Sequence, residues 1–342
     1  MRFADGLKEK GTIGFVAPAF GCATEPYYSA FQNAMSKFKE RGFRCHLGEN
    51  CLLDEGIGIS NTPEKCAGEF MRAWEDETSE CLISCGGGEL MCEIVPFLDF
   101  QRMAEKKPKW FMGYSDNTNL TFLLTTMMDT AAVYGPCAPS FGMEPWHPAL
   151  EDAIAVLMGR KWSMNNYDKW ELESLKDEEH PLAPYHVTES FAMKTFGVRE
   201  NEKVSGRLLG GCLDCLANLV GTSYDRVKEF EERYEKDGVI WFLEACDLNV
   251  FSIRRSLWNL REAGWFRTAK AFLIGRPMHF DEPMFQLDQY EAVTGILGEL
   301  KVPIYMDLDI GHTAPMMPLV SGSLATVCSG DNSISIEMRA VN

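Results

Sequence analysis

The sequence lacks several features that would assign it to a specialised class of protein. No apolar run approaches the ~18 residues that suggest a membrane-spanning helix. The first ten residues, MRFADGLKEK, contain no apolar segment of a secretory signal. Internal repeats and low-complexity tracts are also absent. We therefore expect a soluble, cytoplasmic protein without a membrane partner.

Positive charge is scarce in this chain. Among its 342 residues, 33 are Lys or Arg and 50 are Asp or Glu, so the formal net charge is −17. Polymeric nucleic acid is bound by clustered Lys and Arg side chains, which makes it an unexpected partner here. Hydrophobic residues make up 46% and charged residues 24% of the chain, as in ordinary globular proteins. The length suggests two domains.

Cysteine is abundant, with 12 residues, but its spacing does not form a zinc motif. Cys212 and Cys215 make one C-x-x-C, and neither a second pair nor a nearby histidine completes a set of ligands. Cytoplasmic cysteines are mostly reduced and behave as small buried hydrophobes. The surrounding segment GCLDCLANLVG is apolar, and one helical turn would place both thiols on the same face. We expect core packing for this pair, with a metal or redox role as the alternative.

Apolar runs of strand length alternate with segments of helical periodicity along most of the chain. We predict strands at 12–17, from 43, at 81–84, 109–114, 239–243 and 271–275, with an apolar approach at 302–308. We predict helices at 26–41, 63–74, 120–128, 250–260 and 285–300, and a closing β-hairpin from LATVCSG and SISIEMRA. Such alternation is typical of parallel sheets with covered faces. The fold class is therefore α/β, with an N-terminal parallel-sheet domain at 1–165, an irregular connection at 166–204 and a C-terminal α/β domain at 205–342.

Candidate site residues follow the ends of predicted strands, where open α/β sheets bind ligands. In GYSDN at 113–117, Ser115 stands at the apex of a strand-to-helix turn that would expose its hydroxyl near helix N-terminal amides. The match to G-x-S-x-G is incomplete, because Asn117 replaces the second glycine. Ser115 is thus a candidate nucleophile, and the alternative is that Ser115 or Asp116 only caps the next helix.

A glycine loop, SCGGGE at 84–89, follows another strand. Gly86, Gly87 and Gly88 allow close approach of the backbone to a ligand and can direct N–H groups to an anion. The loop lacks the third glycine of the dinucleotide fingerprint and has no Walker lysine. A tight turn and an oxyanion loop remain the two interpretations. Cys85 could act as the nucleophile of an amidotransferase, although it lacks a glycine two residues before it.

Two further residues complete a possible set for nucleophilic catalysis. Glu244 closes the apolar strand VIWFL, and a carboxylate in that position usually has a partner. His312 lies in DIGHT, after the apolar approach, and the other five histidines have no comparable setting. Serine, acid and histidine in this order supply a nucleophile, an orienting carboxylate and a base.

Six segments, in order, resemble the LD-carboxypeptidase family of serine peptidases. They are GFVAPAFG at 14–21, the glycine loop with EIVPFLDF at 93–100, KWFMGYSDNTNL at 109–120, GRLLGGCLDCLANLVGT at 206–222, WFLEACDLNVFSIRRSLWNLREAGWF at 241–266 and IGHTAPMMPLVSG at 310–322. The resemblance implies Ser115 as nucleophile, His312 as base and Glu244 as the residue that holds the imidazole. It implies an active site between the two domains, an acyl-enzyme, no metal or organic cofactor, and a homodimer.

The resemblance also implies how substrate is held. Backbone N–H groups of Gly87 and Asp116 would form the oxyanion hole, with Gly86 and Gly88 beside the substrate. The sequence departs from the family pattern at Tyr134, where the family often has the histidine of H-G-P, and at Cys212, which replaces the asparagine of G-G-N. Both departures bear on specificity more than on activity.

Two branches of the family remain open for the substrate. Murein LD-carboxypeptidases remove the terminal D-alanine from tetrapeptides in cell-wall recycling, whereas the microcin C self-immunity branch cleaves the amide-type bond between a peptidyl aspartate and a nucleotide. The length and the long 143–204 segment favour the second branch, in which Trp170, or else Trp146 or Trp162, could stack on a base. The alternative for these tryptophans is packing between domains. A non-catalytic protein that binds a small ligand in the same cleft is a third possibility.

Overall fold

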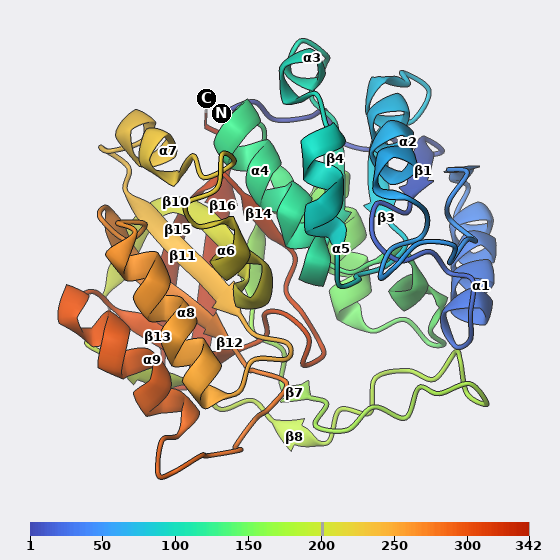
Figure 1. Ribbon diagram of the computed structural model, residues 1–342. Helices are drawn as coiled ribbons and strands as arrows, with labels where there is room; N and C mark the ends of the chain where they lie inside the picture. Colours follow the sequence, from blue (N-terminus) through green and yellow to red (C-terminus); the bar gives the residue numbers. More distant parts are fainter. Residues whose placement is uncertain (200–201, 342) are drawn as a thin grey trace.

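Two α/β lobes lie side by side in the computed structural model, which describes residues 1–199 and 202–341 (Figure 1). The first lobe contains a six-stranded sheet in the order β14-β5-β4-β3-β1-β2. Its strands are β1 (Thr12–Val16), β2 (Arg44–Leu47), β3 (Cys81–Ser84), β4 (Trp110–Gly113), β5 (Ala132–Tyr134) and β14 (Leu319–Ser321). β1 to β5 are parallel, and β14 joins β5 in the antiparallel direction. Because β14 comes from the last part of the chain, it ties the second half to the first sheet.

The second lobe contains an eight-stranded mixed sheet in the order β6-β16-β15-β10-β11-β12-β13-β9. Its strands are β6 (Ser163–Asn165), β9 (Lys194–Phe196), β10 (Lys203–Cys212), β11 (Val239–Glu244), β12 (Ala269–Gly275), β13 (Ile304–Leu308), β15 (Leu324–Gly330) and β16 (Ser333–Arg339). β10 to β13 pair in parallel, and β15 and β16 form an antiparallel hairpin. A separate two-stranded ribbon pairs β7 (Lys169–Trp170) with β8 (Glu189–Ser190).

Helices cover both sheets, and one of them packs between the lobes. The α-helices are α1 (Tyr27–Glu40), α2 (Pro63–Glu75), α3 (Phe100–Ala104), α4 (Thr118–Met128), α5 (Pro148–Leu157), α6 (Leu213–Leu219), α7 (Val227–Arg233), α8 (Val250–Glu262) and α9 (Gln289–Leu297). Short 3₁₀ turns occupy η1 (Met91–Phe97), η2 (Ser115–Asn117), η3 (Ala138–Gly142) and η4 (Gly298–Leu300). α4 contacts β5 of the first sheet and β10 of the second, and every residue of α4 except Met127 is buried. This burial explains why α4 contains no charged residue.

The predicted α/β class and the closing hairpin are confirmed, and the differences are local. The helix predicted at 285–300 begins only at Gln289, because Phe285 and Gln286 have positive φ values of 47° and 68° and the Asp288 side chain caps the helix. Cys212 ends β10, so the two thiols of C-x-x-C do not share one helix as expected. The connection at 166–204 contributes β9 to an edge of the second sheet.

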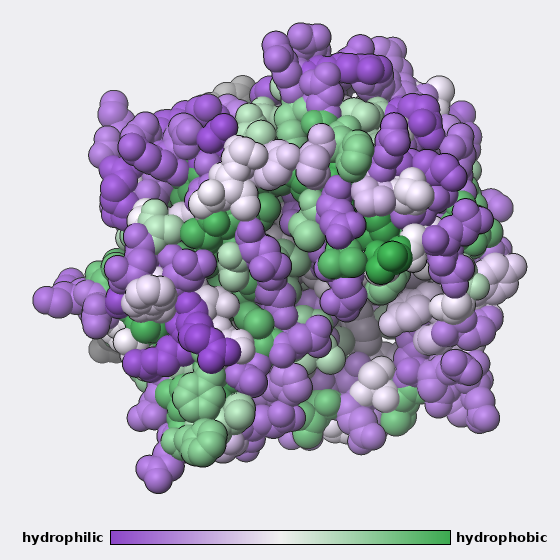
Figure 2. Space-filling model, in the orientation of Figure 1, coloured by the Kyte–Doolittle hydropathy of each residue, from purple (hydrophilic) through white to green (hydrophobic). Residues whose placement is uncertain are grey.

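Among the described residues, no helix is both long and apolar enough to cross a membrane. The face of the molecule seen in Figure 1 is mostly hydrophilic (Figure 2). Apolar side chains gather at its lower left, where the loop between β12 and α9 lies, and Phe285 of that loop is 90% exposed.

Candidate active site

Ser115 lies on a sharp turn between β4 and α4. Its φ is +62°, a left-handed value that is unusual for a residue with a side chain and typical of strained functional turns. The Asn117 amide fixes this turn by donating to the backbone oxygens of Gly86, at 2.7 Å, and Tyr114, at 3.0 Å. A Cβ on Gly87 would lie 3.1 Å from Ser115 Oγ, so the glycine loop lies directly against the hydroxyl. The turn that the sequence predicted therefore exists, with Asn117 in place of the expected second glycine.

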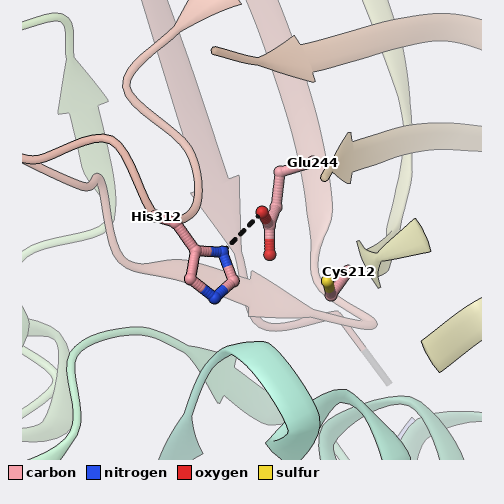
Figure 3. A group of neighbouring side chains, drawn as sticks. All are labelled: Cys212, Glu244 and His312. Atoms are coloured by element: carbon pink, nitrogen blue, oxygen red, sulfur yellow. Dashed lines mark hydrogen bonds and ion pairs between the residues drawn. The ribbon is translucent and has the colours of Figure 1, made fainter. Parts of the chain in front are cut away.

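His312 and Glu244 come to Ser115 from the second lobe. His312 Nε2 lies 2.8 Å from Ser115 Oγ, and His312 Nδ1 lies 2.8 Å from Glu244 Oε2. Figure 3 shows the imidazole facing the carboxylate, which projects from the end of β11. The Glu244 side chain is fully buried and that of His312 is 11% exposed. The structure thus brings together the three residues singled out in the sequence, in the hydrogen-bonding order that nucleophilic catalysis requires.

The charge of Glu244 governs the protonation of His312. Burial lowers the pKa of the imidazole, but the neighbouring Glu244 carboxylate and a contact with Cys246 raise it, and the net pKa lies well above its usual range. A stabilised imidazolium is what a base needs after it has accepted a proton from a hydroxyl.

Tyr134 also belongs to this site, although sequence reasoning noted it only as a departure from the family pattern. Its phenol donates to Glu244 Oε1 and accepts the backbone N–H of Ser115 at 3.2 Å. Burial and the charge of Glu244 raise the pKa of Tyr134 well above its usual range, so the phenol keeps its proton. The signal that could have found it was its position in Tyr-Gly-Pro at the end of β5, beside the strand that carries Ser115.

The Asp116 side chain makes hydrogen bonds to residues outside the nucleophile turn and does not cap α4. Its carboxylate accepts from the Met91 backbone N–H at 2.9 Å and from the Asn119 amide at 2.9 Å. Burial raises the pKa of Asp116 to about 6. Neither Ser115 nor Asp116 makes a side-chain cap to α4, so the capping alternative is wrong.

The glycine loop meets the same turn from the other side. Gly86 O accepts the Asn117 amide, and Gly87 O accepts the Phe20 N–H at 2.7 Å. Within the described part of the chain, the Gly87 N–H has no protein acceptor. A Cβ on Gly88 would lie 3.1 Å from the Ala19 Cβ, so this position has no room for a side chain without movement.

Cys85 has the properties of a core residue. It is fully buried, and burial raises the pKa of its thiol well above the usual range. A nucleophilic cysteine needs exposure and a thiolate. The amidotransferase alternative therefore loses its support.

The three tryptophans of the 143–204 segment are packed against protein. Trp170 is 6% exposed, with the Phe280 ring centroid at 5.0 Å and the Arg276 guanidinium 4.8 Å from its ring. Trp146 packs on Phe38 and Phe141, and Trp162 on Phe3 and Trp110. In this structure the three tryptophan rings contact other side chains, as the packing alternative expects.

Comparison with known proteins matches both halves of the chain to one family. The model of the LD-carboxypeptidase N-terminal domain matches residues 13–135, and that of the C-terminal domain matches residues 205–327. A Vibrio cholerae protein is 25% identical over 343 residues, covering 100% of this chain and 99% of its own. It is named provisionally as a carboxypeptidase. The microcin C7 self-immunity protein of Escherichia coli is 27% identical over 334 residues, covering 95% of this chain and 92% of its own.

Solved structures agree with this placement. The wild-type microcin C7 self-immunity protein without ligand superposes with a TM-score of 0.81 at 25% identity, covering 99% of both chains. A similar protein from Bacillus anthracis superposes with a TM-score of 0.83 at 21% identity, covering 99% of this chain and 100% of its own, and shows the same fold.

Proposed function

The chain belongs to the LD-carboxypeptidase family, and from this premise we propose that it is a serine carboxypeptidase acting near the C-terminus of a small peptide substrate. The observation that carries the proposal is the hydrogen-bonded chain from Ser115 through His312 to Glu244. The three residues come from two lobes. One imidazole links a strained serine to a buried carboxylate, which is the arrangement expected of a catalytic base.

The proposed reaction begins at the Ser115 hydroxyl. His312 Nε2 accepts the hydroxyl proton as Oγ attacks the carbonyl carbon, and Glu244 holds the opposite ring nitrogen as N–H. His312 then gives the proton to the leaving nitrogen, which leaves an acyl group on Oγ. Water, deprotonated by His312, hydrolyses this ester and restores the enzyme.

The developing oxyanion needs donors on the side of the glycine loop. We assign this role to the N–H groups of Gly87 and Asp116, with Gly86 and Gly88 shaping the loop beside the substrate. Two observations support the assignment: among the described residues the Gly87 N–H has no protein acceptor, and a Cβ on Gly87 would lie 3.1 Å from Ser115 Oγ.

For the substrate, we propose the microcin C self-immunity branch, that is, an aminoacyl or peptidyl nucleotide. The microcin C7 self-immunity protein, matched over nearly all of both chains, has been solved with aspartyl sulfamoyl adenosine and, as a mutant, with adenosine monophosphate. Stacking of a base on Trp170 would require Phe280 or Arg276 to leave its ring. The alternative substrate is a murein tetrapeptide that loses its terminal D-alanine. A cytoplasmic homodimer remains part of the proposal, as the family implies.

The deciding assay offers the purified protein aspartyl sulfamoyl adenosine and a murein tetrapeptide side by side. We expect hydrolysis of the former, and Ser115→Ala should lower kcat by about 10⁴-fold or more while the protein stays folded. Ser36→Ala, at an exposed serine of α1, is the control and should keep the wild-type rate. Binding of either compound without turnover would instead support the non-catalytic alternative.

A further inference from the structure

Cys212 lies beside the buried pair of Glu244 and His312. It ends β10, and the parallel register of β10 with β11 places it opposite Glu244. One possible ligand atom from each of Cys212, Glu244 and His312 lies within 4.8 Å of the other two (Figure 3). Cys212 and Glu244 are each 1% exposed, so the group is enclosed by protein.

Thiolate, imidazole and carboxylate together form a donor set suited to zinc. Zn²⁺ binds sulfur at about 2.3 Å and nitrogen or oxygen at about 2.0–2.2 Å, and three protein ligands are enough when the fourth position is open. Tetrahedral ligands at these bond lengths lie roughly 3.3–3.8 Å apart, so side-chain shifts of about 1 Å would close the site. We propose that Cys212, Glu244 and His312 bind Zn²⁺ at a site that overlaps the proposed triad.

The protons balance without any further reactant. The Cys212 thiol, which now donates to Asp214 Oδ2 at 3.2 Å, loses its proton to solvent as sulfur binds the metal. His312 binds the metal through Nδ1, which releases to solvent the proton that faces Glu244, while Nε2 takes up one proton from solvent, so that the ring stays neutral. This N–H then points at Ser115 Oγ, where catalysis needs an acceptor. Zinc is therefore an inhibitor, and this second part of the inference rests on the proposed function.

Two other thiols lie near this group, because Cys215 contacts Cys212 and Cys246 contacts His312, and their single variants serve as controls. Cys215 Sγ lies 3.7 Å from both Ser115 O and Asp116 Oδ1. Cys246 Sγ contacts Asp247 Oδ1 at 3.7 Å and Met278 Sδ at 3.5 Å. All 12 cysteines are free, so stray metal binding must be separated from this site by comparing single variants.

The test uses Co²⁺ as a spectroscopic substitute for Zn²⁺ on the full-length protein under reducing conditions. We expect a thiolate-to-cobalt charge-transfer band that Zn²⁺ abolishes by displacement. Cys212→Ser should weaken Co²⁺ binding by roughly tenfold or more. Loss of a residue that only hydrogen-bonds to a metal ligand already lowers metal affinity about 10–100-fold. Glu244→Gln should also weaken it, and Cys215→Ser should leave it unchanged. A band that survives in Cys212→Ser, or disappears in Cys215→Ser, would overturn the assignment.

The inhibitory part has its own readout. Zn²⁺ should slow labelling of Ser115 by a fluorophosphonate in the wild type, and a chelator should restore it. For Cys212→Ser, the labelling rate is compared with the rate of the same variant without metal. The Zn²⁺ concentration that halves this rate should be about tenfold or more higher than in the wild type. Equal sensitivity of both proteins would refute inhibition through Cys212. Because the cobalt band needs no substrate, its outcome is independent of the proposed hydrolysis.

Discussion

At the residue scale, Tyr134 joins the nucleophile to the acid. Its phenol contacts the Ser115 backbone and the Glu244 carboxylate at once, and it reaches neither the proposed oxyanion donors nor the imidazole nitrogens by any hydrogen bond among the described residues. We therefore regard Tyr134 as a positioning residue, which fixes the carboxylate that orients His312.

Replacing the phenol tests this role. A hydrogen bond to a buried charged group contributes about 1.5–3 kcal/mol, so Tyr134→Phe should lower kcat roughly 10–100-fold with little change in KM. Tyr134→His, which restores a polar group, should recover part of the loss. Steady-state kinetics, with thermal unfolding as a check on folding, measures this. A folded Tyr134→Phe protein with unchanged kcat, or with only KM raised, would show that the contact is structural.

Asp116 offers a second test at this scale, through stability and pH. Its folded-state pKa of about 6 lies above the ordinary 3.8. The folded protein therefore binds the proton more tightly than the unfolded chain, and stability from this group falls as pH rises between these two values. Between about pH 4.5 and pH 7 the wild type should lose about 2 kcal/mol relative to Asp116→Asn, which cannot titrate. Urea unfolding of both proteins at the two pH values checks this, and parallel pH dependence would contradict it.

At the element scale, the contact between β10 and α4 decides how the lobes meet. Gly211 has φ +147°, and a Cβ there would lie 2.5 Å from Thr118 Cγ2. The next residue, Cys212, donates its N–H to Thr118 Oγ1 at 2.9 Å. Thr118 is the first residue of α4, which follows Ser115, so this contact sets the distance between the nucleophile turn and β11.

A methyl group at Gly211 should therefore disturb both stability and catalysis. Gly264 also has positive φ, at +84°, but nothing lies within 4 Å of its would-be Cβ. Gly264→Ala should cost about 1–3 kcal/mol from backbone strain alone. Gly211→Ala should cost a further 1–3 kcal/mol, roughly, from overpacking, and should lower kcat where Gly264→Ala does not. Chemical denaturation measures the free energy of unfolding of both variants, and steady-state kinetics measures their kcat. Equal effects of the two substitutions would contradict a role of the Gly211–Thr118 contact in catalysis.

Elements with strong periodicity could be predicted from sequence, and those defined by tertiary pairing could not. β1, β3 and β11 are fully buried apolar runs, and the spacing of α1, α2 and α8 gave their extent closely. β10 carries two glycines with positive φ just before its last residue and has no alternation, so it is not among the predicted strands. β14 has three residues and becomes a strand only by pairing with β5 of the other half.

At the scale of the whole molecule, the site exists only where the two lobes meet. Ser115 follows β4 of the first sheet, whereas Glu244 ends β11 and His312 follows β13 of the second. Chain order and strand ends were enough to nominate these three residues. The neighbours Tyr134 and Cys212 come beside Glu244 through a hydrogen bond between the lobes and through the pairing of β10 with β11, which no local pattern encodes. Trp170, nominated for stacking, lies against Phe280 and Arg276, and these tertiary contacts are not visible in the local sequence.

The most direct test of the account is the rate and position of labelling by a fluorophosphonate, followed by peptide mass spectrometry. The account predicts one adduct, on Ser115, that forms readily in the wild type, at least about 100-fold more slowly in His312→Ala, and not at all in Ser115→Ala. An adduct on another residue, or an unchanged labelling rate in a folded His312→Ala protein, would contradict the claim that His312 activates Ser115.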